Sequence, residues 1–411
     1  MKHLLKIWVK AITTPQMRNA IRRLAIRAFI LFQRSSSNST LPIGVNLIGY
    51  IRGDFGLGES CRLVAAALRK SGLPFAIRNI PVYGDAPETN ETWSAYENQE
   101  LPYRFNLIHL NPDGLANRIW QLGRNTFHNH YNIGFYLWEQ PEFPSEWSYA
   151  IDLMDEIWTP AEFISQAIRR CTDKPVYTMP YGMSTPQIDQ RYSRSYFDLP
   201  ENIFLFMISY DGYSSSERKN PLGSVRAYCK AFSREDAGVG LVLKATHARE
   251  EDLKEFQALL KDYPNITILR DSYSRIEFNS LLACVDVYVS LHRAEGFGLV
   301  MAEAMELGTA VIATDWSANT EFMNEDVACM VPAEVVELDH DSPPYRKGTR
   351  WASPDENIAA HWMERLYCES DFYEEKVQKA QVYIQKKLSL DDASDRIRQR
   401  VEELFKEKTQ L

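Results

Sequence analysis

An alternation of strand, glycine turn and helix between residues 285 and 314 constrains the fold of this chain more than any other feature. The apolar run 285–291 is typical of a buried strand, and a mostly apolar helix is predicted after the turn, ending where Gly308 can cap it. Residues 310–314 predict the next strand. This order predicts an α/β fold with an open parallel sheet.

Two carboxylates, Glu295 and Glu303, stand eight positions apart around this turn. Ligands of open parallel sheets bind where strands end and helices begin. Amides freed at Gly296 and Gly298, together with the helix dipole, favour an anion such as a diphosphate. The glutamates could then accept hydrogen bonds from hydroxyls on either side of it. A nucleotide sugar, in which a pyrophosphate joins a ribose to a hexose, has this layout.

The spacing of Glu295, Glu303 and Gly308 resembles the signature of retaining family 4 glycosyltransferases of the GT-B fold. The resemblance implies two Rossmann-like, doubly wound domains facing a cleft, with a last helix that crosses back to the first domain. It also implies that Glu295 contacts the donor sugar and Glu303 the ribose. The backbone expected to hold the donor phosphates is that of Gly296, Phe297, Gly298 and Leu299. The alternative is an ordinary amphipathic helix with a solvated carboxylate at each end.

The length of 411 residues exceeds what one hydrophobic core usually supports, so we expect two domains. Six scattered cysteines without paired spacing indicate small buried apolar residues in a reducing compartment. The predicted segments are a basic amphipathic leader (1–34), a Ser-rich linker (35–40), an acceptor domain (41–195), a donor-binding domain (196–385) and a C-terminal helix (386–411).

The net charge of −9 argues against nucleic acid as a partner. Residues 1–34 nevertheless carry basic side chains and no acidic ones, with apolar residues at helical spacing among the arginines. Such a segment is typical of a helix lying on an anionic membrane surface, although too many charges interrupt it for a spanning helix. The alternative is a basic leader packed against the acidic body of the protein.

The first domain is predicted to open with a strand at 43–50, a glycine-rich turn at 52–59 and a helix. This is phosphate-binding architecture, but the glycines do not form a nicotinamide fingerprint. The turn, with Gly53 and Gly56, resembles the family's amino-terminal glycine loop, which faces the donor diphosphate and the acceptor. A plain tight turn is the alternative. The acceptor-side candidates, in this turn and near later strand ends, are Asp54, Asn111, Asp113 and Glu139.

The second domain is predicted to begin with a strand at 203–209, after which Arg218 and Lys219 resemble the family's donor-phosphate motif. Fixed cations there would stabilise the negative charge that grows on a departing diphosphate. The adjacent pair, followed by Asn220, departs from the commoner family pattern, in which several residues separate the two and a glycine follows the lysine. A solvated Arg-Lys pair at a helix start is the alternative.

The resemblance implies a retaining, metal-independent hexosyltransferase without a cofactor, which uses a nucleotide-sugar donor. Arg218, Lys219 and Glu295 are its expected catalytic residues, and no protein nucleophile is nominated. The basic leader suggests a saccharide or lipid-linked acceptor in surface-polysaccharide assembly, on the cytoplasmic face of a bacterial plasma membrane. Two alternatives are a sugar-nucleotide isomerase of related shape and an inactive, membrane-associated saccharide-binding protein.

Overall fold

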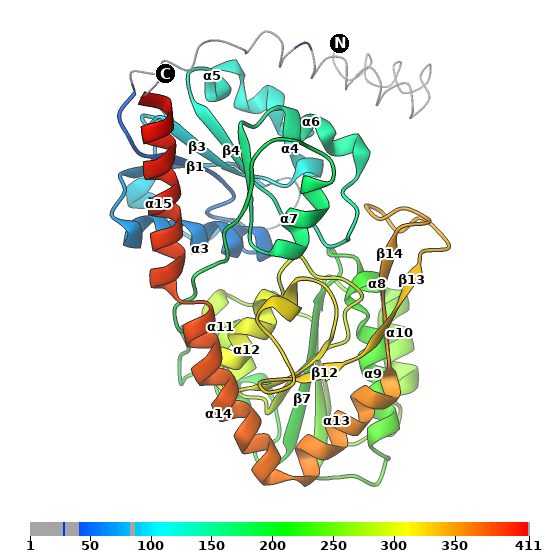
Figure 1. Cartoon of the computed structure of the whole chain (residues 1–411). Helices are drawn as coiled ribbons and strands as arrows, with labels where there is room; N and C mark the ends of the chain where they lie inside the picture. Colours follow the sequence, from blue (N-terminus) through cyan, green and yellow to red (C-terminus); the bar gives the residue numbers. More distant parts are fainter. Residues whose placement is uncertain (1–27, 29–40, 83–86, 410–411) are drawn as a thin grey trace, which may run out of the picture.

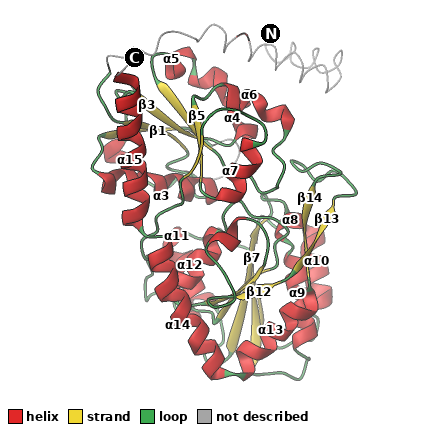
Figure 2. Ribbon diagram, viewed as in Figure 1, coloured by secondary structure: helices red, strands yellow, loops and turns green. Residues whose placement is uncertain are grey.

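The computed structural model describes residues 28, 41–82 and 87–409. Apart from residue 28, the predicted leader (1–34) and linker (35–40) lie outside the described residues. The described chain forms two α/β domains, one above the other in Figure 1, each with helices around a sheet (Figure 2). None of the described helices combines the length and the apolar character needed to cross a bilayer.

The first domain is built on a six-stranded parallel sheet of order β2-β1-β3-β4-β5-β6. Its strands are β1 (Val45–Gly49), β2 (Phe75–Asn79), β3 (Phe105–His109), β4 (Tyr131–Phe135), β5 (Glu156–Thr159) and β6 (Val176–Thr178). Its α-helices are α3 (Gly56–Ser71), α4 (Pro112–Leu122), α5 (Arg124–Phe127), α6 (Ser148–Asp152) and α7 (Glu162–Arg169). The strand order reverses between β1 and β3, which is where such sheets bind ligands.

The second domain repeats this plan with the order β12-β11-β10-β7-β8-β9, again all parallel. Its strands are β7 (Phe204–Asp211), β8 (Val239–Thr246), β9 (Ile266–Leu269), β10 (Val287–Ser290), β11 (Ala310–Thr314) and β12 (Cys329–Val331). Its α-helices are α8 (Ser216–Lys219), α9 (Pro221–Ala231), α10 (Glu250–Leu259), α11 (Arg275–Ala283), α12 (Leu299–Leu307) and α13 (Glu356–Cys368). The predicted pair of doubly wound α/β domains is confirmed.

A two-stranded antiparallel hairpin, β13 (Ala333–Glu337) and β14 (Arg350–Pro354), follows the last strand of the second sheet. In Figure 1 it projects from the second domain beside the boundary with the first. This hairpin was not predicted from the sequence.

Two long helices close the chain, α14 (Ser370–Lys387) and α15 (Leu390–Thr409). Helix α14 packs on the second domain, whereas α15 lies beside α3 of the first (Figure 1). The expected return of the last helix to the first domain is therefore confirmed. A buried ion pair fixes this contact, because Arg400 Nη2 lies 2.8 Å from Glu156 Oε2 of β5.

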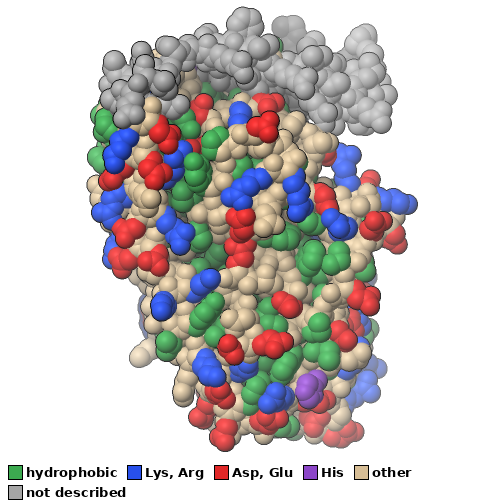
Figure 3. All heavy atoms as spheres, in the orientation of Figure 1, with side chains coloured by type: hydrophobic (Ala, Val, Ile, Leu, Met, Phe, Trp, Pro, Cys, Tyr) green, Lys and Arg blue, Asp and Glu red, His purple; other side chains and the backbone are tan. Residues whose placement is uncertain are grey.

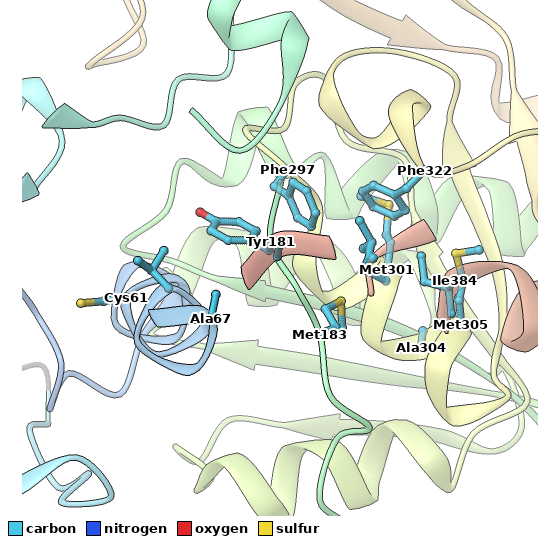
Figure 4. Close-up of a cluster of buried hydrophobic side chains, with 14 of the residues drawn as sticks. Cys61, Ala67, Tyr181, Met183, Phe297, Met301, Ala304, Met305, Phe322 and Ile384 are labelled. Carbon is cyan, nitrogen blue, oxygen red and sulfur yellow. The ribbon is translucent and has the colours of Figure 1, made fainter. Parts of the chain in front are cut away.

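One hydrophobic cluster runs through both domains. Figure 4 shows the ring of Tyr181, which follows β6, beside the ring of Phe297 of the second domain, and their centroids lie 4.7 Å apart. The same cluster includes residues of α3, α12 and α15. On the face shown in Figure 3, by contrast, acidic and basic side chains are interspersed.

Two local expectations need correction. All six cysteines are free, but Cys171 and Cys368 are exposed, so describing every cysteine as buried was wrong. The predicted glycine turn is shorter than expected, because α3 already begins at Gly56. Gly58 lies inside that helix, where an added Cβ would stand 2.0 Å from the Gly53 carbonyl oxygen. The helix can thus approach the preceding turn only if residue 58 is glycine.

We predict that Arg400→Met lowers the free energy of unfolding by about 3–5 kcal/mol, because it leaves the buried Glu156 carboxylate without its cation. Urea denaturation of purified protein measures the effect. Arg398→Met, on the same helix, removes only an exposed ion pair with Asp395 and should change stability little. Equal effects of the two substitutions would contradict a fixing role for Arg400.

Candidate functional site

The candidate site lies where the strand order of the second sheet reverses, between β7 and β10. The chain leaving β7 leads into the short helix α8, which ends at Lys219, and the chain leaving β10 carries Glu295 into α12. Because neighbouring parallel strands end at the same edge, these segments meet. The main chain joins them directly, since the Arg293 amide donates to the Arg218 carbonyl at 2.7 Å.

Arg218, Lys219 and Glu295 form a buried ion cluster. The Lys219 ammonium contacts Glu295 Oε1, and Arg218 Nη1 lies 3.3 Å from the same oxygen. The side chains of Arg218 and Glu295 are 6% and 10% exposed, against 26% for Lys219. The alternatives of a solvated Arg-Lys pair and of a solvated Glu295 are therefore wrong.

The two cations have different surroundings. The Arg218 guanidinium also donates to the Ala294 carbonyl at 2.7 Å and to Ser214 Oγ at 2.8 Å, so protein groups fix its position. Lys219 keeps more solvent access and a flexible stem. Arg218 thus forms the rigid part of the cluster, and Lys219 is the cation able to move toward an added anion.

Asn220 occupies the position where the commoner family pattern has glycine. Its φ of +50° is left-handed, a conformation that glycine and asparagine adopt most readily. Its side chain accepts from the Gly223 amide at 3.2 Å and donates to the Leu291 carbonyl at 2.8 Å. Asn220 therefore adopts the backbone conformation that glycine would adopt. Its side chain also caps α9 and links the segment after β7 to the segment after β10.

The glycine turn before α12 leads directly into the amino terminus of that helix. Gly298 has a φ of +97° and is the N-cap of α12, whose first intrahelical bond runs from the Met301 amide to the Gly298 carbonyl. The amides of Leu299 and Val300 precede that bond. They belong to the first amides of the helix, which have no intrahelical acceptor and can bind an anion. Phe297 instead points into the interdomain core, against Tyr181 and Phe322.

Glu303 lies in α12 and is 3% exposed, so it too is not solvated. One of its oxygens pairs with Arg275 at the start of α11, and Oε2 is buried without a hydrogen-bond partner among the described residues. Arg275 Nε also lies 3.8 Å from Glu59 Oε2, which belongs to α3 of the first domain. Arg275 was not predicted from the sequence, because no short motif marks it.

The four acceptor-side candidates have different surroundings. Asp54 is exposed and accepts hydrogen bonds from Thr89. Asn111 Oδ1 accepts from the Leu137 amide at 3.0 Å, and Asp113 is exposed in the first turn of α4. Glu139 alone reaches the ion cluster, where the charges of Arg218 and Glu295 act on it.

Of the first-domain glycines, Gly53 precedes α3 and Gly56 lies at its start. Arg62 of that helix donates to the Gly53 carbonyl at 2.8 Å, and Gly56 is the first residue of the helix. The carbonyl of Gly53 is therefore already engaged within its own domain.

Tyr345, between β13 and β14, is a further member of the site that the sequence did not reveal. Its hydroxyl donates to Glu139 Oε2 at 3.2 Å, and it is 4% exposed. Because this contact joins residues far apart in the sequence and in different domains, no local pattern signals it.

Burial and the neighbouring charges within the ion cluster shift the pKa values of Glu295 and Lys219. Burial opposes the charge on Glu295, but Lys219 and Arg218 together outweigh it and lower the pKa of this carboxyl to about 2. For Lys219, burial prevails and lowers the pKa of the ammonium, although Glu295 opposes that shift. We infer that an ionised Glu295 neutralises part of the buried positive charge before any ligand binds.

Comparisons with known proteins agree with this architecture. The Rossmann-like pair of domains matches HepE of Anabaena, solved in complex with UDP and glucose, with a TM-score of 0.61 at 13% identity over 88% of this chain and all of the other. The fold is GT-B. A glycosyltransferase from Rickettsia africae matches with a TM-score of 0.62 at 14% identity, over 89% of this chain and 99% of the other. Sucrose-phosphate synthase of Thermosynechococcus elongatus matches with a TM-score of 0.61 at 15% identity, over 88% of this chain and 99% of the other.

A family model described as "Glycosyl transferases group 1" matches residues 216–338. This segment contains Arg218, Lys219, Glu295 and Glu303. Sequence comparison with curated proteins finds no match. Together, the family match and the fold support a GT-B glycosyltransferase.

We predict that Glu295→Gln destabilises the protein more at pH 6 than at pH 3.5. A carboxyl with a lowered folded-state pKa stabilises the fold above its unfolded pKa of about 4.3, and this contribution is lost as the pH falls toward about 2. Urea midpoints of both proteins at the two pH values measure it. A difference between the proteins that does not shrink at pH 3.5 would contradict the lowered pKa.

Proposed function

We propose that the protein is a retaining, metal-independent glycosyltransferase that transfers a hexose from a nucleotide-sugar donor to a saccharide or lipid-linked saccharide acceptor. The observation that carries this proposal is the convergence of Arg218 and Lys219 on Glu295 beside the first turn of α12. Two cations, a carboxylate and a helix amino terminus meet there, which suits a diphosphate attached to a polyhydroxylated sugar.

In this proposal the donor diphosphate binds to Lys219, Arg218 and the backbone of residues 296–299, while Glu295 orients the transferred sugar and Glu303 the ribose. The acceptor hydroxyl attacks the anomeric carbon from the side that the diphosphate leaves, and a phosphate oxygen takes the hydroxyl proton. The configuration is then retained without a protein nucleophile. The two cations stabilise the charge of the departing diphosphate, a role that needs no metal ion.

A uridine diphosphate sugar is the first donor to test, since HepE of Anabaena was solved with UDP. Nucleoside diphosphates that bind the native state raise its melting temperature with concentration. A thermal-shift series with UDP, GDP, ADP and dTDP therefore identifies the preferred base.

We predict that Lys219→Ala and Glu295→Ala each reduce transfer by at least about 100-fold, the usual effect of removing one preorganised electrostatic group. Assays with nucleotide-sugar panels should measure both sugar transfer and nucleoside diphosphate release, with circular dichroism to verify folding. Lys254→Ala, on the exposed face of α10, is the matched control. Near-normal turnover of Lys219→Ala would exclude the donor-site assignment.

The same assay separates the alternatives. A sugar-nucleotide isomerase would rearrange the donor without an acceptor. An inactive saccharide-binding protein would release no nucleoside diphosphate and would tolerate substitution of Lys219 and Glu295.

We further propose that residues 1–34 bind the protein to the cytoplasmic face of a bacterial plasma membrane, where surface polysaccharides are assembled. Support comes from their basic, amphipathic sequence alone. We predict that the full chain cosediments with vesicles containing anionic lipid and that a chain lacking residues 1–34 does not. Equal sedimentation of both chains would favour the alternative of a leader packed against the acidic body.

A further inference from the structure

The hairpin of β13 and β14 crosses the domain boundary with polar contacts to one segment of the first domain, residues 139–146. Arg346 Nη2 lies 2.6 Å from Glu146 Oε1, Arg350 pairs with Glu142, and Gln140 Nε2 donates to Thr349 Oγ1 at 3.0 Å. The family match ends at residue 338, before these contacts. The hairpin and the acidic segment are therefore complementary in charge.

Tyr345, in the segment between β13 and β14, places its hydroxyl beside the ion cluster. Aromatic rings from both domains fix its ring, since Trp138 lies 5.6 Å away and Trp351 lies 6.3 Å away between centroids. Burial raises the pKa of Tyr345 well above its usual range, so the hydroxyl keeps its proton and can donate to Glu139.

Glu139 lies alongside the loop expected to hold the donor. A Cβ added at Gly296 would stand 3.7 Å from Glu139 Cγ. Arg218, Lys219, Glu295 and Tyr345 are the titratable groups that face Glu139. Burial raises the pKa of its carboxyl, while Arg218 and the hydrogen bond from Tyr345 oppose that rise.

We propose that Tyr345 is a positioning residue of the transfer site. Its hydroxyl orients the Glu139 carboxylate, which accepts a hydrogen bond from a hydroxyl of a saccharide acceptor, and Arg346 and Arg350 hold the hairpin in place. The inference rests on the proposed function and extends it to acceptor recognition. It follows from geometry, because Glu295 belongs to the second-domain segment that forms the expected donor loop, whereas Glu139 faces that loop from the first domain.

Steady-state kinetics of Tyr345→Phe with the preferred donor and a saccharide acceptor test the proposal. This substitution keeps the ring packing and removes only the hydroxyl. We expect kcat/KM for the acceptor to fall by about 10-fold or more, the usual effect of losing a hydrogen bond to a charged group, with the donor KM unchanged. The acid limb of the pH profile should move to higher pH, because the hydrogen bond stabilises ionised Glu139.

A double-mutant cycle separates positioning from general packing. Glu139→Gln should abolish the acid limb, and Tyr345→Phe should have no further effect in that background.

Arg350→Glu should lower kcat/KM for the acceptor, and adding Glu142→Arg should restore it. Arg398→Glu is the control, since its ion pair with Asp395 is similarly exposed.

Three outcomes would overturn the inference. Normal acceptor kinetics of Tyr345→Phe would exclude a role for the hydroxyl. An equal loss in the wild-type and Glu139→Gln backgrounds would show that Tyr345 does not act through Glu139. A wild-type protein that transfers no sugar from any donor would refute the proposed function and this inference with it, whereas the first two outcomes leave the proposed function intact.

Discussion

The ion cluster of Arg218, Lys219 and Glu295 is the interaction on which the site depends. Charged groups are costly to bury unless they are paired, so each of these residues requires the others. The pairing in turn requires that the segments leaving β7 and β10 run side by side, which the reversal of strand order provides. The amide of Arg293 and the side chain of Asn220 hold these segments together. The sheet topology thus determines where the cluster forms, and the backbone contacts determine its geometry.

The sequence predicted those parts of the molecule that depend on neighbouring residues. Strand β10, the turn at Gly298 and helix α12 follow from apolar runs and glycines that lie close together in the chain. Arg218, Lys219 and Glu295 were identified because they lie in the segments after predicted strands and resemble motifs of the family. The length of the chain indicated two domains, whereas their arrangement across a cleft was expected only from the family resemblance, which carries information that apolar periodicity lacks.

The remaining features depend on contacts between distant residues. Tyr345 meets Glu139 only because a hairpin of the second domain packs on the first. Arg275 meets Glu303 because α11 and α12 lie on the same face of the sheet, and no spacing in the sequence encodes that contact. Asp54 and Asn111 were expected near an acceptor because Asp54 lies in the glycine-rich turn and Asn111 follows a strand. Their side chains bond within the first domain, and a position near a strand end does not by itself decide which group a side chain will contact.

In the proposed reaction, donor binding must exchange the partners inside the ion cluster. Lys219 contacts Glu295 in this structure, so it can bind a phosphate only by sharing or leaving that carboxylate. Less of the negative charge on the buried Glu295 carboxylate would then be neutralised. This state costs free energy unless a sugar hydroxyl donates a hydrogen bond to Glu295. A diphosphate without a sugar supplies the anion for Lys219 but no hydroxyl for Glu295. A nucleotide sugar supplies both, and the cluster therefore favours the intact donor over the released nucleoside diphosphate.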